Sequence, residues 1–101
     1  MSTVTLIEYP KSYVVIAETH ANTTEACAAI SMMVTALANW AHDHGDNQST
    51  LLPGKALISI PKTAESRAVY EFTETAFKGL AEIGEITLKK CKSLGKNQKS
   101  V

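Results

Sequence analysis

One cysteine and one histidine in the first third of the chain are suited by type and spacing to nucleophilic catalysis. Six residues separate His20 from Cys27. His20 follows a predicted strand and Cys27 lies near the first turn of the predicted helix after it, and two such elements can lie side by side. Unpaired N–H groups at a helix start favour a thiolate over a thiol. The spacing therefore indicates a thiol–imidazole pair, with Ser31 one helical turn beyond Cys27.

Two alternatives to this interpretation are a structural role for the cysteine and a metal site elsewhere in the chain. A cysteine inside an alanine-rich helix commonly does no more than pack against the core. Residues 42–46 contain histidine and aspartate, as metal-binding tracts do. However, helix positions two apart face different ways, and a third ligand would have to come from elsewhere. We predict no metal site and no cofactor, and we expect Cys91, which lies between lysines, to be an exposed thiol without a role.

The elements that must position the pair follow from hydrophobic periodicity and from the Gly and Pro positions. Strands are predicted over residues 3–9, 12–18, 55–60 and 85–90, and helices over residues 22–42 and 64–83. The order β-β-α-β-α-β predicts an α+β fold, with a small mixed or antiparallel sheet of four strands and both helices packed on one face. Residues 46–54 are predicted to be a loop.

Both predicted helices carry an apolar stripe that should face the sheet. In the first helix the stripe covers more than half the circumference, which favours a central position; its residues are Ile30, Met33, Val34, Leu37, Trp40 and Ala41. In the second helix the predicted stripe is Val69, Phe72, Ala76, Leu80 and Ile83.

Length and charge limit the organisation. The chain has 101 residues and no net charge, which allows a single domain. We assign residues 1–90 to one α+β domain and residues 91–101 to a basic tail that we expect to be mobile. Ten acidic and five basic residues up to position 88 are followed by five lysines and no acid. These lysines either keep the chain soluble or attract RNA or another polyanion weakly, in a salt-dependent way.

The composition also bears on location. No apolar run approaches the roughly 18 residues that a membrane-spanning helix needs, so no membrane partner is expected. Two cysteines 64 positions apart do not form a disulfide framework. A reducing, cytoplasmic environment is therefore predicted.

Several short segments carry a family resemblance. The first are the His20-Ala21 pair and the run Cys27-Ala28-Ala29-Ile30-Ser31. They are followed by Val34-Thr35-Ala36-Leu37 and by Phe77-Lys78-Gly79-Leu80-Ala81-Glu82-Ile83. Together these segments resemble the ribosomal-processing cysteine protease family. In all, the resemblance extends over residues 1 to about 90.

The resemblance implies a cytoplasmic homodimer that trims an N-terminal extension from a protein of the large ribosomal subunit. It implies that Cys27 is the nucleophile and His20 the base, and that Ser31 lines the site, with Thr24 and Glu25 in supporting positions. The sequence differs from the family pattern at three points. Thr19 stands where the family has glycine, Thr24 where it has aspartate, and the glycine-rich segment between His20 and Cys27 is shortened and lacks glycine.

Two other functions remain open at this point. One is a divergent, phage-encoded relative that processes a virion protein. The other is a module of the same fold that binds the ribosome or another protein without catalysis.

Overall fold

The computed structural model describes residues 2–18, 24–45, 49–52 and 54–92, and for residues 24–26 it describes the backbone alone. These residues form an α+β fold. The strands are β1 (Ser2–Glu8), β2 (Ser12–Glu18), β3 (Thr50–Leu52), β4 (Lys55–Pro61) and β5 (Ile86–Lys92), and the helices are α1 (Thr24–Asp43) and α2 (Ala64–Glu82). The α+β class is therefore confirmed.

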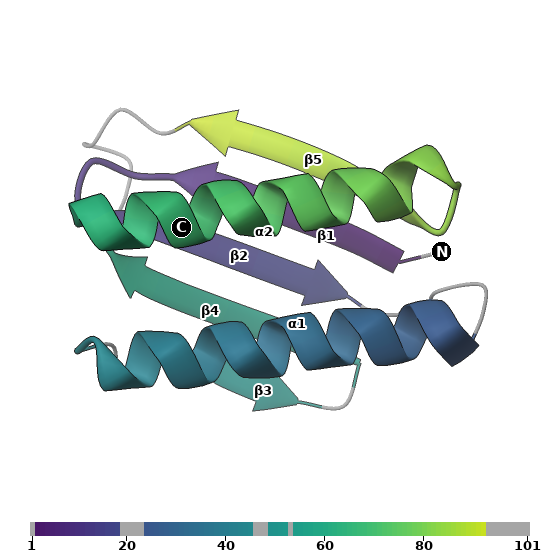
Figure 1. The fold of residues 1–101 in the computed structure, drawn as a ribbon, viewed down its shortest axis with the longest axis horizontal. Helices are drawn as coiled ribbons and strands as arrows, with labels where there is room; N and C mark the ends of the chain where they lie inside the picture. The colour runs from purple at the N-terminus through teal and green to yellow at the C-terminus, as the bar shows by residue number, and fades with distance from the viewer. Residues whose placement is uncertain (1, 19–23, 46–48, 53, 93–101) are drawn as a thin grey trace.

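The five strands form one mixed sheet in the order β3-β4-β2-β1-β5. Four strands pair antiparallel, and β5 runs parallel to β1, with Ser2 opposite Ile86. Both helices lie on the same face of this sheet (Figure 1). The sheet is thus mixed, one of the two predicted types, and it packs both helices on one face as expected.

The prediction of four strands is wrong, because the segment predicted as a loop contains the short strand β3. Thr50, Leu51 and Leu52 pair with β4, and all three side chains are exposed. A three-residue edge strand is too short to show alternation, and it is held by backbone bonds to its neighbour. Gly54, with φ of +76°, lies in the tight turn between the two strands, a conformation that glycine adopts without strain.

The core fills the space between the sheet and the helices. Alternate residues of the strands point inward, as the two-residue period requires. Fully buried side chains of the sheet and of both helices pack together there, and the largest of them are Phe77, Leu6, Ile30, Ile58 and Ile60. In α1 the predicted stripe is inward, with Met33 and Trp40 partly buried at its margin.

The predicted stripe of α2 is rotated from the observed one. The buried residues are Ser66, Tyr70, Thr73 and Phe77, whereas Phe72 and Ile83 are 68% and 69% exposed. Ser66 and Thr73 can face the sheet because their hydroxyls form hydrogen bonds at the N-cap of the helix or within it: Ser66 Oγ accepts from Thr63 N, and Thr73 Oγ1 donates to the Val69 carbonyl at 2.8 Å. Hydroxyl groups satisfied in this way cost little to bury.

Both helices end near glycines with positive φ. Gly45 follows α1 with φ of 96°, and Gly84 follows α2 with φ of 80°. Among the described residues, neither helix is long and apolar enough to cross a membrane.

Candidate functional site

Cys27 lies in the first turn of α1. The helix begins at Thr24, so Cys27 is its fourth residue and is close to the backbone N–H groups that have no acceptor within the helix. Its side chain is half-buried and forms no disulfide. A thiol in this position is neither sealed in the core nor fully open to solvent.

Ser31 borders a hollow between α1 and the β3–β4 hairpin. The side chain is exposed and lies on the same side of the helix as Cys27, one turn further on. The hollow has a volume of about 170 Å³, and its walls are Ser31, Val34 and Thr35 of α1 with Leu51, Leu52, Gly54, Lys55 and Ala56 of the hairpin. It begins one helical turn beyond the thiol.

His20 lies outside the described residues, but the strand that leads to it ends beside this hollow. Glu18, the last residue of β2, pairs with Lys55 of β4, and Lys55 is one of the residues that line the hollow. The last described residue before His20 therefore lies near the hollow that Ser31 borders. The pairing of the His20 imidazole with the Cys27 thiol stays a prediction.

The other residues singled out in the sequence have different surroundings. The side chains of Thr24 and Glu25 lie outside the described residues. His44 stacks on Trp40, with ring centroids 3.8 Å apart, and its Nδ1 lies 2.8 Å from the Trp40 carbonyl oxygen. These contacts hold the His44 ring against the last turn of α1, just after the helix ends at Asp43. No group of three or more His, Cys, Asp or Glu residues within the described segments is arranged to hold a metal ion. Cys91 is an exposed free thiol.

A second hollow, which the sequence did not indicate, lies between α2 and the ends of the neighbouring strands. We call it the polar cleft. It has a volume of about 540 Å³ and is lined by Glu8, Tyr13, Lys62, Arg67, Tyr70, Glu71, Glu74, Lys90 and Lys92. Figure 1 places the start of α2 and the end of β1 at one end of the sheet, and the start of α1 at the other. The cleft is therefore remote from Cys27.

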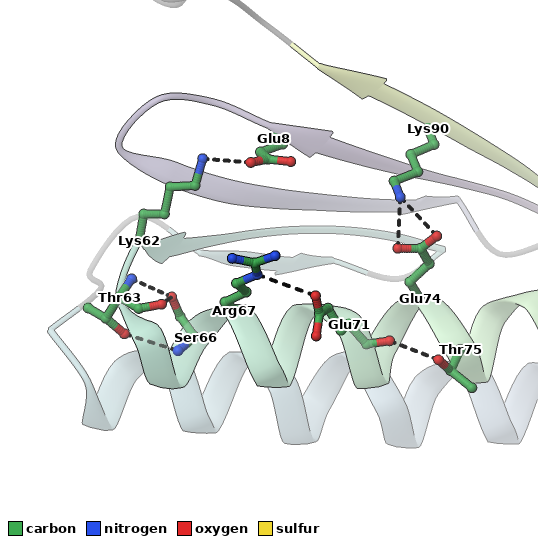
Figure 2. A network of polar contacts seen from close by, with 9 residues as sticks. All are labelled: Glu8, Lys62, Thr63, Ser66, Arg67, Glu71, Glu74, Thr75 and Lys90. Carbon is green, nitrogen blue, oxygen red and sulfur yellow. Dashed lines mark hydrogen bonds and ion pairs between the residues drawn. The ribbon is translucent and has the colours of Figure 1, made fainter.

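Ion pairs cross the polar cleft (Figure 2). Lys62 Nζ lies 2.7 Å from Glu8 Oε2, and Lys90 Nζ donates to both carboxylate oxygens of Glu74 at 3.0 Å. The hydrogen bond from Lys62 holds the pKa of Glu8 below its ordinary value, and the hydrogen bond from Lys90 does the same for Glu74. At neutral pH both carboxylates are therefore ionised, and the paired lysine balances the negative charge of each.

The only trace of this cleft in the sequence is the two-residue spacing of Lys90 and Lys92. That spacing places both lysines on one face of β5, but it does not reveal which helix covers them.

Comparison with known proteins finds no family model that matches the chain and no curated protein that matches it.

Proposed function

We propose that this chain is a cysteine endopeptidase in which Cys27 is the nucleophile and His20 the base. The substrate is the N-terminal extension of a large-subunit ribosomal protein, as the resemblance to the ribosomal-processing proteases suggests. The enzyme acts in the cytoplasm as a homodimer. The observation that carries the proposal is the half-buried Cys27 in the first turn of α1, one helical turn from a hollow.

The hollow supports a peptide-cleaving role because its walls suit an extended chain. Val34, Leu51 and Leu52 offer apolar surface, and Ser31 and Thr35 offer hydroxyls. A substrate side chain held there would place the next peptide bond near Cys27, since one turn of helix advances about 5.4 Å. Ser31 thus acts as a positioning residue.

The chemistry follows from the two side chains. The Cys27 sulfur attacks the peptide carbonyl carbon, so a C–S bond forms and the carbonyl oxygen takes the negative charge. Backbone N–H groups at the start of α1 stabilise that oxyanion. The imidazolium of His20 gives its proton to the amine as the C–N bond breaks. Water then hydrolyses the thioester, and His20 accepts a proton from it.

The experiment is incubation of the purified chain with a large-subunit ribosomal protein that carries its N-terminal extension, with products identified by mass spectrometry. We expect one cut for the wild type and none for Cys27→Ala, and a large loss of kcat for His20→Ala. Cys91→Ala is the matched control, because it removes the other, exposed thiol, and it should cleave like the wild type.

The possible outcomes separate the competing functions. Cleavage that survives in Cys27→Ala would overturn the proposal. Tight binding of the extended protein without cleavage would favour the binding module. Cleavage of a virion protein but not of the ribosomal one would keep the chemistry and change the substrate.

A further inference from the structure

We infer that the polar cleft is a second site, distinct from Cys27, that binds the phosphate group of a small molecule. Three groups in the cleft point to this ligand: the hydroxyl of Tyr70, the terminal nitrogens of Arg67 and the ammonium group of Lys92. Each is a hydrogen-bond donor without an acceptor among the described residues.

Tyr70 supplies the strongest evidence. The residue is 3% exposed and lines the cleft, yet its buried hydroxyl has no hydrogen-bond partner in the described part of the chain. Most buried polar groups are paired, and an unpaired one costs about 1–3 kcal/mol. Burial, followed by the nearby Glu74 and Glu8 carboxylates, raises the pKa of Tyr70 to about 12. The hydroxyl therefore keeps its proton at neutral pH and can donate it.

Arg67 and Lys92 add positive charge, which attracts a phosphate. Arg67 contacts Glu71 through Nε alone, at 3.4 Å, and Figure 2 marks no contact from its two terminal nitrogens to the other residues drawn. Lys92 lies opposite Glu8 across the β1–β5 pair, but Glu8 is already bound at 2.7 Å by Lys62. Arg67 and Lys92 thus retain hydrogen-bonding capacity that a phosphate can use.

Charge and size then define the ligand. Four cationic and three anionic side chains line the cleft, and the carboxylates of Glu8 and Glu74 are held by lysines. The remaining positive charge selects an anion. The volume of about 540 Å³ lies within the range of roughly 300–1,000 Å³ typical of small-molecule sites. It exceeds the needs of a bare phosphate ion, so we expect the phosphate to be attached to a larger group.

The test is calorimetric titration of the full chain at fixed ionic strength with inorganic phosphate, with a nucleoside 5′-monophosphate and with the unphosphorylated nucleoside. We expect the two phosphates to bind and the nucleoside not to bind. Tyr70→Phe should weaken phosphate affinity about tenfold, because it removes one hydrogen bond to a charged group.

Lys92→Ala and Lys89→Ala form a matched pair. Both remove one charge from β5, but residues one or three apart in a strand face opposite sides, so Lys89 lies on the face away from the cleft. Lys92→Ala should weaken phosphate binding about tenfold and Lys89→Ala should leave it within about twofold.

Equal losses from the two lysine variants would overturn the proposal, because they would show only a general charge effect. An unchanged affinity in a folded Tyr70→Phe variant would also overturn it. So would stronger, steeply salt-dependent binding of a short RNA without a terminal phosphate, which would identify a polyanion surface instead. Arg67→Ala, a change at a side chain that is 72% exposed, gives a further variant that should fold and should bind phosphate more weakly.

Discussion

Tyr13 of β2 and Tyr70 of α2 stack with their ring centroids 4.3 Å apart and their planes inclined by 19°. Lys62 Nζ lies 5.1 Å from the Tyr13 ring centroid. The stack joins the sheet to the helix beneath the polar cleft. It therefore links the stability of the fold to the surface on which we place the phosphate.

Substitutions in this stack distinguish the contribution of the Tyr70 hydroxyl from that of the aromatic contact. Tyr70→Phe keeps the aromatic contact and removes an unpaired hydroxyl, so we expect its free energy of unfolding to stay within about 1 kcal/mol of the wild type. Tyr13→Leu removes the ring and should lower the free energy of unfolding by about 0.5–1.5 kcal/mol beyond the loss of buried area. Urea denaturation followed by circular dichroism measures both. A larger loss in Tyr70→Phe than in Tyr13→Leu would show that the hydroxyl has a structural partner.

Thiol reactivity tests the proposed nucleophile without a substrate. Cys91 is exposed and Cys27 is half-buried, so access alone predicts faster alkylation of Cys91. An activated Cys27 should reverse this order at pH 6, and His20→Ala should restore it. Peptide mapping after brief treatment with iodoacetamide gives both rates. Faster labelling of Cys91 in the wild type would argue against an activated Cys27. The unfolded chain, in which the thiols should react alike, is the control.

Ser31 allows a test of the hollow. Ser31→Phe should fill part of the hollow and raise KM for a peptide substrate several-fold, with a smaller effect on kcat, because residue 31 takes no part in the bond-breaking step itself. Ser31→Ala, which leaves the space open, is the control and should change KM less. Since residue 31 is exposed, neither variant should lower the melting temperature by more than a few degrees. A KM that is unaffected by Ser31→Phe would place the substrate elsewhere.

The lowered pKa of Glu74 leads us to expect that the stability of the fold falls at acidic pH. Its side chain is 13% exposed and pairs with Lys90 and Lys78, and the hydrogen bond from Lys90 lowers its pKa from the ordinary value of 4.5. A carboxylate with a lowered pKa in the folded state stabilises the fold above that ordinary value, and the contribution is lost as the pH falls below it.

Glu74→Gln should therefore cost about 1 kcal/mol at pH 7 and much less at pH 3. Denaturant unfolding at the two pH values checks the difference. Glu71→Gln is the control, since its contact with Arg67 is 3.4 Å long and lies between exposed side chains, and it should have a smaller effect at pH 7. Equal effects of the two variants would contradict the assigned role of Glu74.

The start of α2 provides a prediction for stability alone. Thr63 Oγ1 accepts a hydrogen bond from Ser66 N at 3.0 Å, while Thr63 N donates to Ser66 Oγ at 2.7 Å. Thr63→Ala should lower the free energy of unfolding by about 0.5–2 kcal/mol. Thr75→Ala, an exposed change within the same helix, should be neutral or slightly stabilising because alanine favours helix. Equal losses in both variants would show that the cap contributes nothing specific.

The predictions from sequence succeeded where periodicity was long and regular. The strand predicted over residues 12–18 has the same bounds in the structure, Ser12–Glu18. Strand β3 was not predicted, because its three exposed residues depend on β4 for their backbone hydrogen bonds. The predicted stripe of α2 is rotated from the buried one. Val69 and Leu80 pack partly against the core, but Ser66 and Thr73 are more deeply buried, because their hydroxyls are satisfied within or beside their own helix.

The two candidate sites also differ in how far the sequence could predict them. Cys27 and Ser31 are neighbours on one helix, so local spacing was enough to predict that they share a side. The polar cleft unites Glu8, Tyr13, Tyr70 and Lys92 from three strands and a helix. Their meeting depends on the parallel pairing of β1 with β5, which no local pattern specifies. Of the predicted basic tail, residues 91–101, the structure describes only Cys91 and Lys92, and both belong to β5. The attraction of the tail to polyanions stays a prediction.

The pairing of Ser2 with Ile86 has a consequence during synthesis. While the ribosome is still making the chain, the outer backbone edge of β1 has no strand beside it, since residues 86–92 are translated long after residues 2–8. An unpaired edge of this kind is an aggregation hazard. The sheet can be completed only after α2 has emerged, and pairing over so great a separation slows folding. Nascent chains that stop before residue 86 should therefore depend on chaperones, whereas chains that extend past residue 92 should not.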